Sequence, residues 1–200
     1  MFATHFSRII RIVIGCVFSA LLLVAPVVYA DSFQQDSGTE GLVSIEAENY
    51  DANTPVGVHA WEFVTPGGYS GTGAMQALPD NGTNINTDYV TNSSRLDYAI
   101  NFVQTGTHYL WIRGQASSIA SDSLHAGIDG TAVSTSDRIA FFDSSWGWSN
   151  GTMDGTVAVI NVASEGIHTL NIWMREDGMV LDKLVLTTAS GYTPTGSGPA

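Results

Sequence analysis

The chain has 200 residues, with 7 Lys+Arg against 19 Asp+Glu and a formal net charge of −12. A surface this acidic repels the phosphates of nucleic acids and anionic lipids, so the charge excludes nucleic-acid binding and favours neutral partners. The length is sufficient for one domain with a sizeable hydrophobic core.

The first thirty residues have the pattern of a secretory signal peptide. Arg8 and Arg11 give a basic start, residues 12–28 are nearly all apolar, and VYA at 28–30 is a small-residue cleavage site. We therefore predict a protein that is secreted, periplasmic or on the cell surface, without a membrane contact after cleavage. A retained membrane anchor is the weaker alternative. Cys16, the only cysteine, lies in this segment, so the core or a metal must replace disulfides.

Composition divides the remaining chain into three parts. Residues 31–41 are polar and predict a flexible lead-in, and residues 42–188 contain the apolar periodic pattern of a domain. Residues 189–200 (ASGYTPTGSGPA) have the Gly, Ser, Thr and Pro content of a linker or tail. Such a linker would join the domain to a further domain, for example a catalytic one.

The domain has the period-two hydrophobic pattern of short β-strands, and no segment has the pattern of a long helix. The expected strands cover residues 95–102, 108–113, 124–129, 157–162, 168–174 and 179–187, and Asp129-Gly130 is a hairpin signal. Many short strands at this spacing predict an all-β fold, an antiparallel β-sandwich of the jelly-roll type.

Two glutamates open the domain in IEAENY, residues 45–50. Because i and i+2 share one face of a strand, the Cα atoms of Glu46 and Glu48 are expected about 6.5–7 Å apart. That spacing suits two carboxylates that share a calcium ion, and it also lies near the lower limit for an inverting glycosidase pair. Two exposed glutamates on an edge strand are an equally plain interpretation.

A third acid, Asp182, lies in the apolar run MVLDKLVLT, residues 179–187. Strict alternation places it on the same face as two leucines, where an acid must be paired or bind a metal. If the first and last strands are neighbours, Asp182 meets Glu46 and Glu48.

Four motifs together resemble the carbohydrate-binding modules of families six and thirty-five, which are galactose-binding-like β-sandwiches. They are the Glu-Ala-Glu strand, GGYSGTG (67–73), YLWIRG (109–114) and GIHTLNIWMREDGMVLDKLVLT (166–187). The resemblance covers about residues 42–188. It implies a structural calcium held by Glu46, Glu48 and Asp182, with backbone carbonyls near Ser70 or Gly71 as further ligands.

Sugar binding requires an aromatic platform, because the C–H face of a pyranose is apolar while its rim carries hydroxyls. The candidate platform is the loop FFDSSWGWSNGTMDG (141–155), in which Trp146 and Trp148 lie among Ser, Gly and Asn. The resemblance implies a tyrosine that faces this loop, for which Tyr89 is the candidate, and Trp61 lines the same site or covers the end of the sandwich.

Asparagines supply the expected polar contacts of this site. Asn81 lies near Tyr89 in the sequence and is a candidate ligand. One position departs from the resembling family, because Val180 stands where those modules commonly carry a sugar-binding asparagine. Asn81 or Asn150 would then replace that contact, or the ligand binds on the concave face of a sheet.

Three functions follow from these observations. The first is a secreted, non-catalytic carbohydrate-binding module, with no catalytic residue, that holds a polysaccharide or oligosaccharide by aromatic stacking. The second is a small jelly-roll glycoside hydrolase or polysaccharide lyase that uses Glu46 and Glu48, or the loop acids Asp143 and Asp154. The third is an adhesion or matrix domain without sugar specificity.

Overall fold

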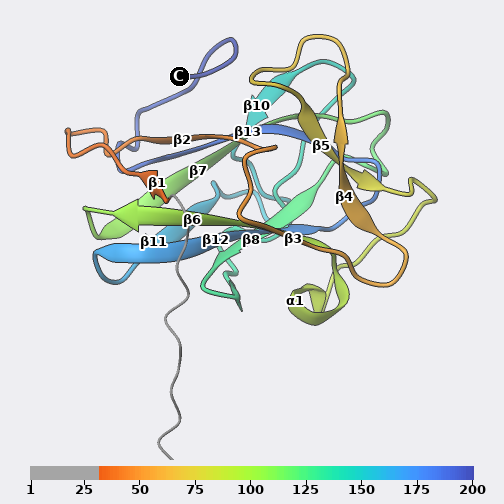
Figure 1. Ribbon diagram of the computed structural model, residues 1–200, viewed down its shortest axis with the longest axis horizontal. Coiled ribbons are helices and arrows are strands. Elements are labelled where there is room, and N and C mark those ends of the chain that lie inside the picture. The colour runs from red at the N-terminus through yellow and green to blue at the C-terminus, as the bar shows by residue number, and fades with distance from the viewer. Residues whose placement is uncertain (1–31) are drawn as a thin grey trace, which may run out of the picture.

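The alternating apolar residues of the predicted strands face one another across two stacked β-sheets (Figure 1). The computed structural model describes residues 32–200. The predicted signal peptide, residues 1–30, lies outside the described residues. Within residues 32–200, no helix has both the length and the hydropathy that a membrane crossing requires.

The first sheet has six strands, in the order β1-β6-β12-β8-β9 with β3 also paired to β6. These strands are β1 (Phe33–Gln34), β3 (Ala52–Thr54), β6 (Arg95–Phe102), β8 (Leu124–Ile128), β9 (Thr131–Ala132) and β12 (Gly166–Met174). Only β1 runs parallel to its neighbour among the described strands. The turn from β8 to β9 is formed by Asp129 and Gly130, both with positive φ, as expected from the Asp-Gly pair.

The second sheet has seven strands, in the order β10-β7-β13-β5-β4, with β11 also paired to β7 and β2 to β13. These strands are β2 (Val43–Glu46), β4 (Ala60–Val64), β5 (Ala74–Leu78), β7 (Gly106–Gln115), β10 (Gly147–Ser149), β11 (Val159–Val162) and β13 (Val180–Thr187). A single turn of helix, α1 (Tyr89–Asn92), precedes β6. The predicted all-β, mostly antiparallel sandwich is therefore confirmed, and β2 and β13 are neighbours as expected.

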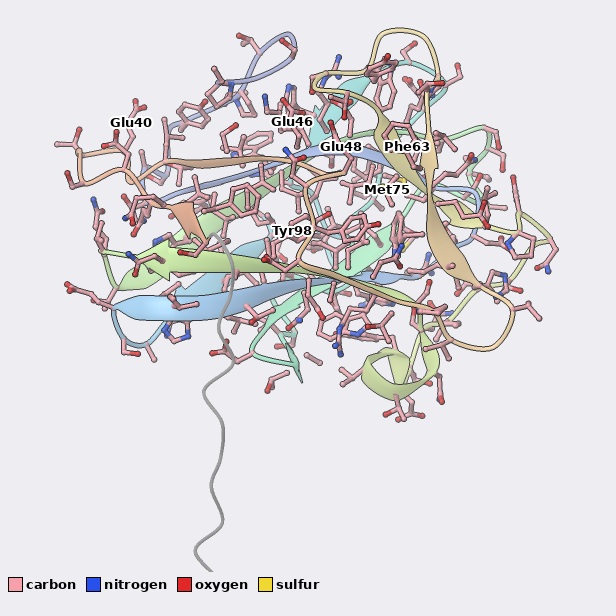
Figure 2. All side chains as sticks on the ribbon, in the orientation of Figure 1. Glu40, Glu46, Glu48, Phe63, Met75 and Tyr98 are labelled. Atoms are coloured by element: carbon pink, nitrogen blue, oxygen red, sulfur yellow. The ribbon has the colours of Figure 1, made fainter. Side chains whose placement is uncertain are left out.

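The core lies between the two sheets and is formed by aliphatic and aromatic side chains from both. Its largest fully buried members are Trp61, Trp173, Tyr98, Phe102, Ile45, Met75, Leu96, Ile100, Leu110, Ile112, Leu124 and Ile139. Tyr98 lies between the layers (Figure 2), and its hydroxyl donates to the carbonyl of Ala47 at 2.8 Å, so this buried hydroxyl is paired.

A β-bulge interrupts β13 between Leu181 and Lys183. Because of the bulge, Leu181 and Leu184 both face the core, and Asp182 is the extra residue between them. The expectation of strict alternation, which placed Asp182 on the face of the leucines, is therefore corrected. The side chain is nevertheless fully buried, as that expectation required.

Both segments that flank the core strands contact the sandwich. Residues 33–34, within the expected lead-in, form β1, and Gln35 beside them is only 2% exposed. Residues 194–199, within the expected linker, lie against the second sheet, where the carbonyls of Gly196 and Pro199 accept hydrogen bonds from its side chains. The ordered part of the fold thus includes residues on both sides of 42–188.

Candidate functional site

Three acidic side chains gather on the second sheet at the junction of β2 and β13. Glu46 on β2 lies opposite Lys183 on β13, so it is next to Asp182. Ser70, in the connection between β4 and β5, joins the two acids. Its hydroxyl lies 2.6 Å from Glu46 Oε2 and 2.8 Å from Asp182 Oδ2, and its backbone N–H donates to Asp182 Oδ1 at 2.7 Å.

Glu48 follows the end of β2 and lies beside Glu46 (Figure 2). Its Oε1 accepts hydrogen bonds from the backbone N–H (2.6 Å) and the hydroxyl (3.0 Å) of Thr72. Its Oε2 is buried without a hydrogen-bond partner. Gly71 has φ +62°, and a Cβ there would lie 2.3 Å from Glu48 Oε1, so only glycine allows the backbone to approach this closely.

Two basic side chains compensate part of this negative charge. Lys183 Nζ lies 2.7 Å from Glu46 Oε1, and Arg113 Nη1 lies 2.5 Å from Asp182 Oδ2. The three carboxylates exceed the two cationic side chains by one negative charge. Glu48 is the acid without a basic partner here, and its Oε2 is the unpaired atom. No three Asp, Glu, His or Cys side chains of residues 32–200 form a metal-binding group in this arrangement. The oxygen donors, the residual charge and the unpaired atom nevertheless fit a hard cation such as calcium.

Trp146 and Trp148, the predicted platform residues, are both partly exposed and lie on the second sheet. Trp148 is on β10, opposite Arg113 on β7. Trp146 immediately precedes β10, donates its Nε1–H to the carbonyl of Gly67 at 2.8 Å, and lies 5.1 Å from the Arg113 guanidinium in a cation–π contact. Both indoles thus lie near Arg113, and the expectation that at least one of them contacts a ligand stays a prediction.

Trp61 and Tyr89 were expected to line the ligand site, but the structure buries both rings. Their packing against other side chains accounts for their positions without a ligand. Trp61 is 1% exposed and belongs to the core. Tyr89 is 7% exposed, its ring stacks on His125 at 3.8 Å between centroids, and its edge contacts Trp173. Neither ring has a free face, so we correct the expectation and remove both from the candidate ligand site.

Asn81 and Asn150 are in different places. Asn81 is exposed, in a loop whose backbone N–H groups at Asn81 (2.8 Å), Gly82 (3.2 Å) and Thr83 (3.0 Å) all donate to Asp177. Burial opposes ionisation of Asp177, but these donations hold its pKa below the usual range. Asn150 lies just after β10, where its carbonyl accepts from Ala158 at 2.6 Å. The structure does not bring Asn81 and Asn150 together.

A cavity of about 350 Å³ opens on the second sheet at the start of β13. Its floor is one row of the sheet, in which Val180 lies opposite Gln76 of β5 on one side and Gln115 of β7 on the other. The further lining residues are Val64, Pro66, Ala116, Ser117, Ser144 and Gly178. Amides, hydroxyls and apolar groups therefore line it, and none of these described lining residues is ionisable.

Val180 departs in the sequence from the resembling modules, but no local pattern indicated a role for Gln76 or Gln115. The only available signal was the position of Val180 just before the Leu-Asp pair of the last strand. Gln76 and Gln115 are 39 positions apart in the chain. Only the pairing of β5 and β7 with β13 brings them to either side of Val180. Gln76 is held in place by donating its Nε2 to the carbonyl of Gly178 at 3.1 Å.

A buried ionic network holds the loops beside Gly178. Arg175 Nη1 donates to Glu176 Oε1 at 2.7 Å and to Ser123 Oγ at 2.6 Å, and Asn84 Nδ2 donates to Glu176 Oε1 at 2.8 Å. Asp122 lies against this network, and its Oδ1 is buried without a hydrogen-bond partner. Burial, with the Glu176 carboxylate as the next cause, raises the pKa of Asp122 to about 6.

We expect Asp122→Asn to stabilise the protein at pH 7.5 by roughly 1–3 kcal/mol. Because the folded pKa of Asp122 lies above its unfolded value, its stabilising contribution is present below pH ~4 and is lost as the pH rises through about 6. Urea unfolding between pH 4 and 7.5 measures this. The variant's stability should fall less over that range than the wild type's, whereas Asp36→Asn, at an exposed residue, should change nothing. If the unfolding free energy of Asp122→Asn falls with pH as steeply as that of the wild type, the raised pKa of Asp122 would be contradicted.

Comparison with known proteins gives matches of two kinds. The family model of the glycosyl hydrolase family 115 C-terminal domain matches residues 37–200. An uncharacterized protein, P23 of Formosa agariphila, is 28% identical over 193 residues, which cover 80% of this chain and 47% of that protein. The chain thus spans about half the length of this curated relative.

Solved structures show the same kind of fold. A family 35 carbohydrate-binding module from Clostridium thermocellum superposes with a TM-score of 0.50 at 18% identity, over 74% of this chain and 98% of that one. The family 35 module from Paenibacillus barcinonensis is 24% identical over 73% of this chain and 98% of its own, with a TM-score of 0.49. The resemblance inferred from the sequence motifs is confirmed at the level of the fold. Since the family model matches most of the chain, the protein belongs to the family of glycosyl hydrolase family 115 C-terminal domains.

Proposed function

We propose that this domain binds a neutral polysaccharide without cleaving it, with the cavity above Val180 as the site for part of the sugar chain. The observation that carries the proposal is the uncharged row Gln76–Val180–Gln115, in which two amides flank an apolar centre. A pyranose offers the complementary surface, an apolar face with a rim of hydroxyls. The volume lies at the lower end of the usual range for small-molecule sites, about 300–1,000 Å³, so it suits a short part of a chain.

An aromatic ring lies beside this cavity. Pro66 lines the cavity, and the next residue, Gly67, accepts the hydrogen bond from the Trp146 indole. Ser144, two residues before Trp146, also lines it. Trp146 is therefore positioned to contact the part of a bound chain that extends out of the cavity.

The acids named in the hydrolase alternative are engaged elsewhere. Glu46 and Glu48 are bonded to Lys183, Ser70 and Thr72, and neither lines the cavity. Asp143 accepts from the backbone N–H of Ser145 at 2.7 Å, and Asp154 pairs with Arg138. Glycoside hydrolysis requires two carboxyl groups on either side of the scissile bond, so this arrangement favours binding over cleavage.

Family membership suggests the setting in which binding would be useful. The family is described as a C-terminal domain of glycosyl hydrolases. We infer that such a domain acts as an exported, ancillary module that keeps a catalytic domain close to its polysaccharide. Local retention of the substrate raises its effective concentration at the linked active site.

The test is affinity electrophoresis of the exported chain in gels that contain neutral or acidic polysaccharides, followed by a reducing-end assay of the sugars. We expect retardation by a neutral polysaccharide and no new reducing ends. Gln76→Ala and Gln115→Ala should each weaken binding about 3- to 10-fold, because a hydrogen bond contributes roughly 0.5–1.5 kcal/mol. Asn161→Ala is the matched control, an exposed amide on β11. New reducing ends, or equal binding by all variants, would refute the proposal.

We further propose that Glu46, Glu48 and Asp182 hold a structural calcium ion together with backbone oxygens near Ser70 and Gly71. The support is the residual negative charge, the unpaired Glu48 Oε2 and the close backbone approach at Gly71. A bound divalent ion would add electrostatic stabilisation, and these residues would orient it between β2 and β13.

Calcium should therefore raise the melting temperature relative to EDTA. At a calcium concentration of about 100 times the dissociation constant, the expected stabilisation is ~2.7 kcal/mol. Glu48→Gln should remove most of the response to calcium, whereas Glu62→Gln, at an exposed position of β4, should keep it. Differential scanning calorimetry measures both, and identical melting temperatures in calcium and EDTA would contradict the proposal.

A further inference from the structure

The segment with linker-like composition, residues 194–199, lies on the outer face of the second sheet, the face that points away from the core. Figure 1 shows the last residues of the chain looping beside β2 and β10. The segment forms a turn in which the N–H of Gly198 donates to the carbonyl of Thr195 at 2.9 Å. Gly196 and Gly198 both have positive φ, which glycine adopts at little cost. The GSG sequence thus specifies a particular turn.

This turn contacts Trp148 and Arg113 through one atom. The Gly196 carbonyl accepts hydrogen bonds from Trp148 Nε1 at 3.0 Å and from Arg113 Nε at 3.2 Å. The Pro199 carbonyl accepts from the Ser44 hydroxyl of β2 at 2.9 Å. Gly198 lies so close to the indole that an added Cβ would be 2.6 Å from Trp148 Cζ2.

Beneath the turn, four side chains form one row across the sheet. Trp148 lies opposite Arg113, Arg113 opposite Lys183, and Lys183 opposite Glu46, on β10, β7, β13 and β2. Lys183 and Arg113 are only 4% and 8% exposed. Their charges are already paired with Glu46 and Asp182, so the face presents an indole and N–H donors with no free charge.

An aromatic face with neighbouring N–H donors is the surface that a neutral sugar requires. The turn supplies matching groups, since the Gly198 backbone lies on the indole and the Gly196 carbonyl is the acceptor for two donors. A pyranose would supply its C–H face to the indole and a hydroxyl or ring oxygen to the same donors. The turn therefore covers the groups that such a sugar would contact.

We propose that the Trp148–Arg113 face is a second carbohydrate-binding surface, which residues 194–199 occupy until a neutral polysaccharide chain displaces them. This inference rests on the proposed carbohydrate-binding function and adds a site distinct from the Val180 cavity. Because the segment competes with the ligand, the apparent affinity of this face is reduced by the fraction of time for which it is uncovered.

The test uses the exported chain with Gln76→Ala and Gln115→Ala as a background, so that the cavity contributes little. On this background, Gly196→Ala with Gly198→Ala should release the turn, because alanine is strained at positive φ and its Cβ at 198 meets the indole. Gly191→Ala is the matched control, since a Cβ there meets nothing within 4 Å and its φ is not positive. Acrylamide quenching of tryptophan fluorescence reports the release of the turn.

We expect the double-glycine variant to bind a neutral polysaccharide about tenfold more tightly than the background, as for a face that is covered nine-tenths of the time. Gly191→Ala should leave binding unchanged, and adding Trp148→Ala to the released variant should abolish the gain. If release occurs without tighter binding, or if the gain survives Trp148→Ala, the second site is refuted while binding by the wild-type cavity still supports the proposed function. If the wild type and every variant bind no polysaccharide, both proposals fall.

Discussion

Asp182→Ala is expected to destabilise the protein by about 3–5 kcal/mol when unfolding is measured in EDTA. Asp182 is fully buried and pairs with Arg113, which is itself 8% exposed. Removing the carboxylate leaves a buried guanidinium without its counter-ion, and the two groups of Ser70 lose their acceptor. Measurement in EDTA separates this loss from any loss of bound calcium.

Two variants serve as controls for this prediction. Asp182→Asn keeps the shape and one acceptor oxygen, so its cost should be smaller than that of alanine. Asp154→Ala removes the acid of an exposed Asp–Arg pair with Arg138, and its effect should stay within about 1 kcal/mol. Urea unfolding at pH 7 measures all three. If Asp182→Ala and Asp154→Ala lower the free energy of unfolding equally, burial of the Asp182–Arg113 pair does not decide how much the pair contributes to stability.

Trp61→Ala is expected to cost about 3–5 kcal/mol of stability and to leave the polysaccharide affinity of the folded protein unchanged. Trp61 is 1% exposed, and its Nε1 donates to the carbonyl of Ser94 at 3.4 Å. A cavity in the core would replace the indole, and every residue that lines the Val180 cavity would be kept. Thermal unfolding, with binding measured well below the melting temperature, separates stability from recognition.

Phe63→Ala is the control on the same strand, because Phe63 is 55% exposed (Figure 2). Its effect on stability should be within about 0.5 kcal/mol. A Trp61→Ala variant that is fully stable but does not bind would restore the ligand role that the sequence suggested for Trp61. Loss of stability with binding intact would confirm that the residue serves the core alone.

Local pattern predicted the bounds of several strands well. The predicted strand 95–102 coincides with β6, and 124–129 and 179–187 differ from β8 and β13 by one residue at one end. Period-two alternation is a property of neighbouring residues, so it is available without knowledge of the fold. The bulge at Asp182 was missed because it depends on how β7 pairs with β13, and that pairing is not encoded in the alternation of either strand.

The role of aromatic residues was harder to predict than the strands. The neighbours of Trp61 and Tyr89 in the sequence did not predict their burial, yet the sandwich buries both. Trp146 and Trp148 are partly exposed, and their predicted contact with a ligand stays a prediction. Burial is set by what packs against a side chain from distant parts of the chain, which the local sequence does not contain.

The sequence by itself determined the all-β class, the acidic character and the motifs of the family, because propensity, alternation and charge are local or additive properties. Only the tertiary structure decided which residues share a surface. It placed Gln76 and Gln115 on either side of Val180, paired Arg113 with Asp182, and laid a linker-like GSG turn on Trp148. The physical reason is that β-sheet pairing joins residues far apart in the chain, and the register that aligns them is fixed by the packing of the whole core.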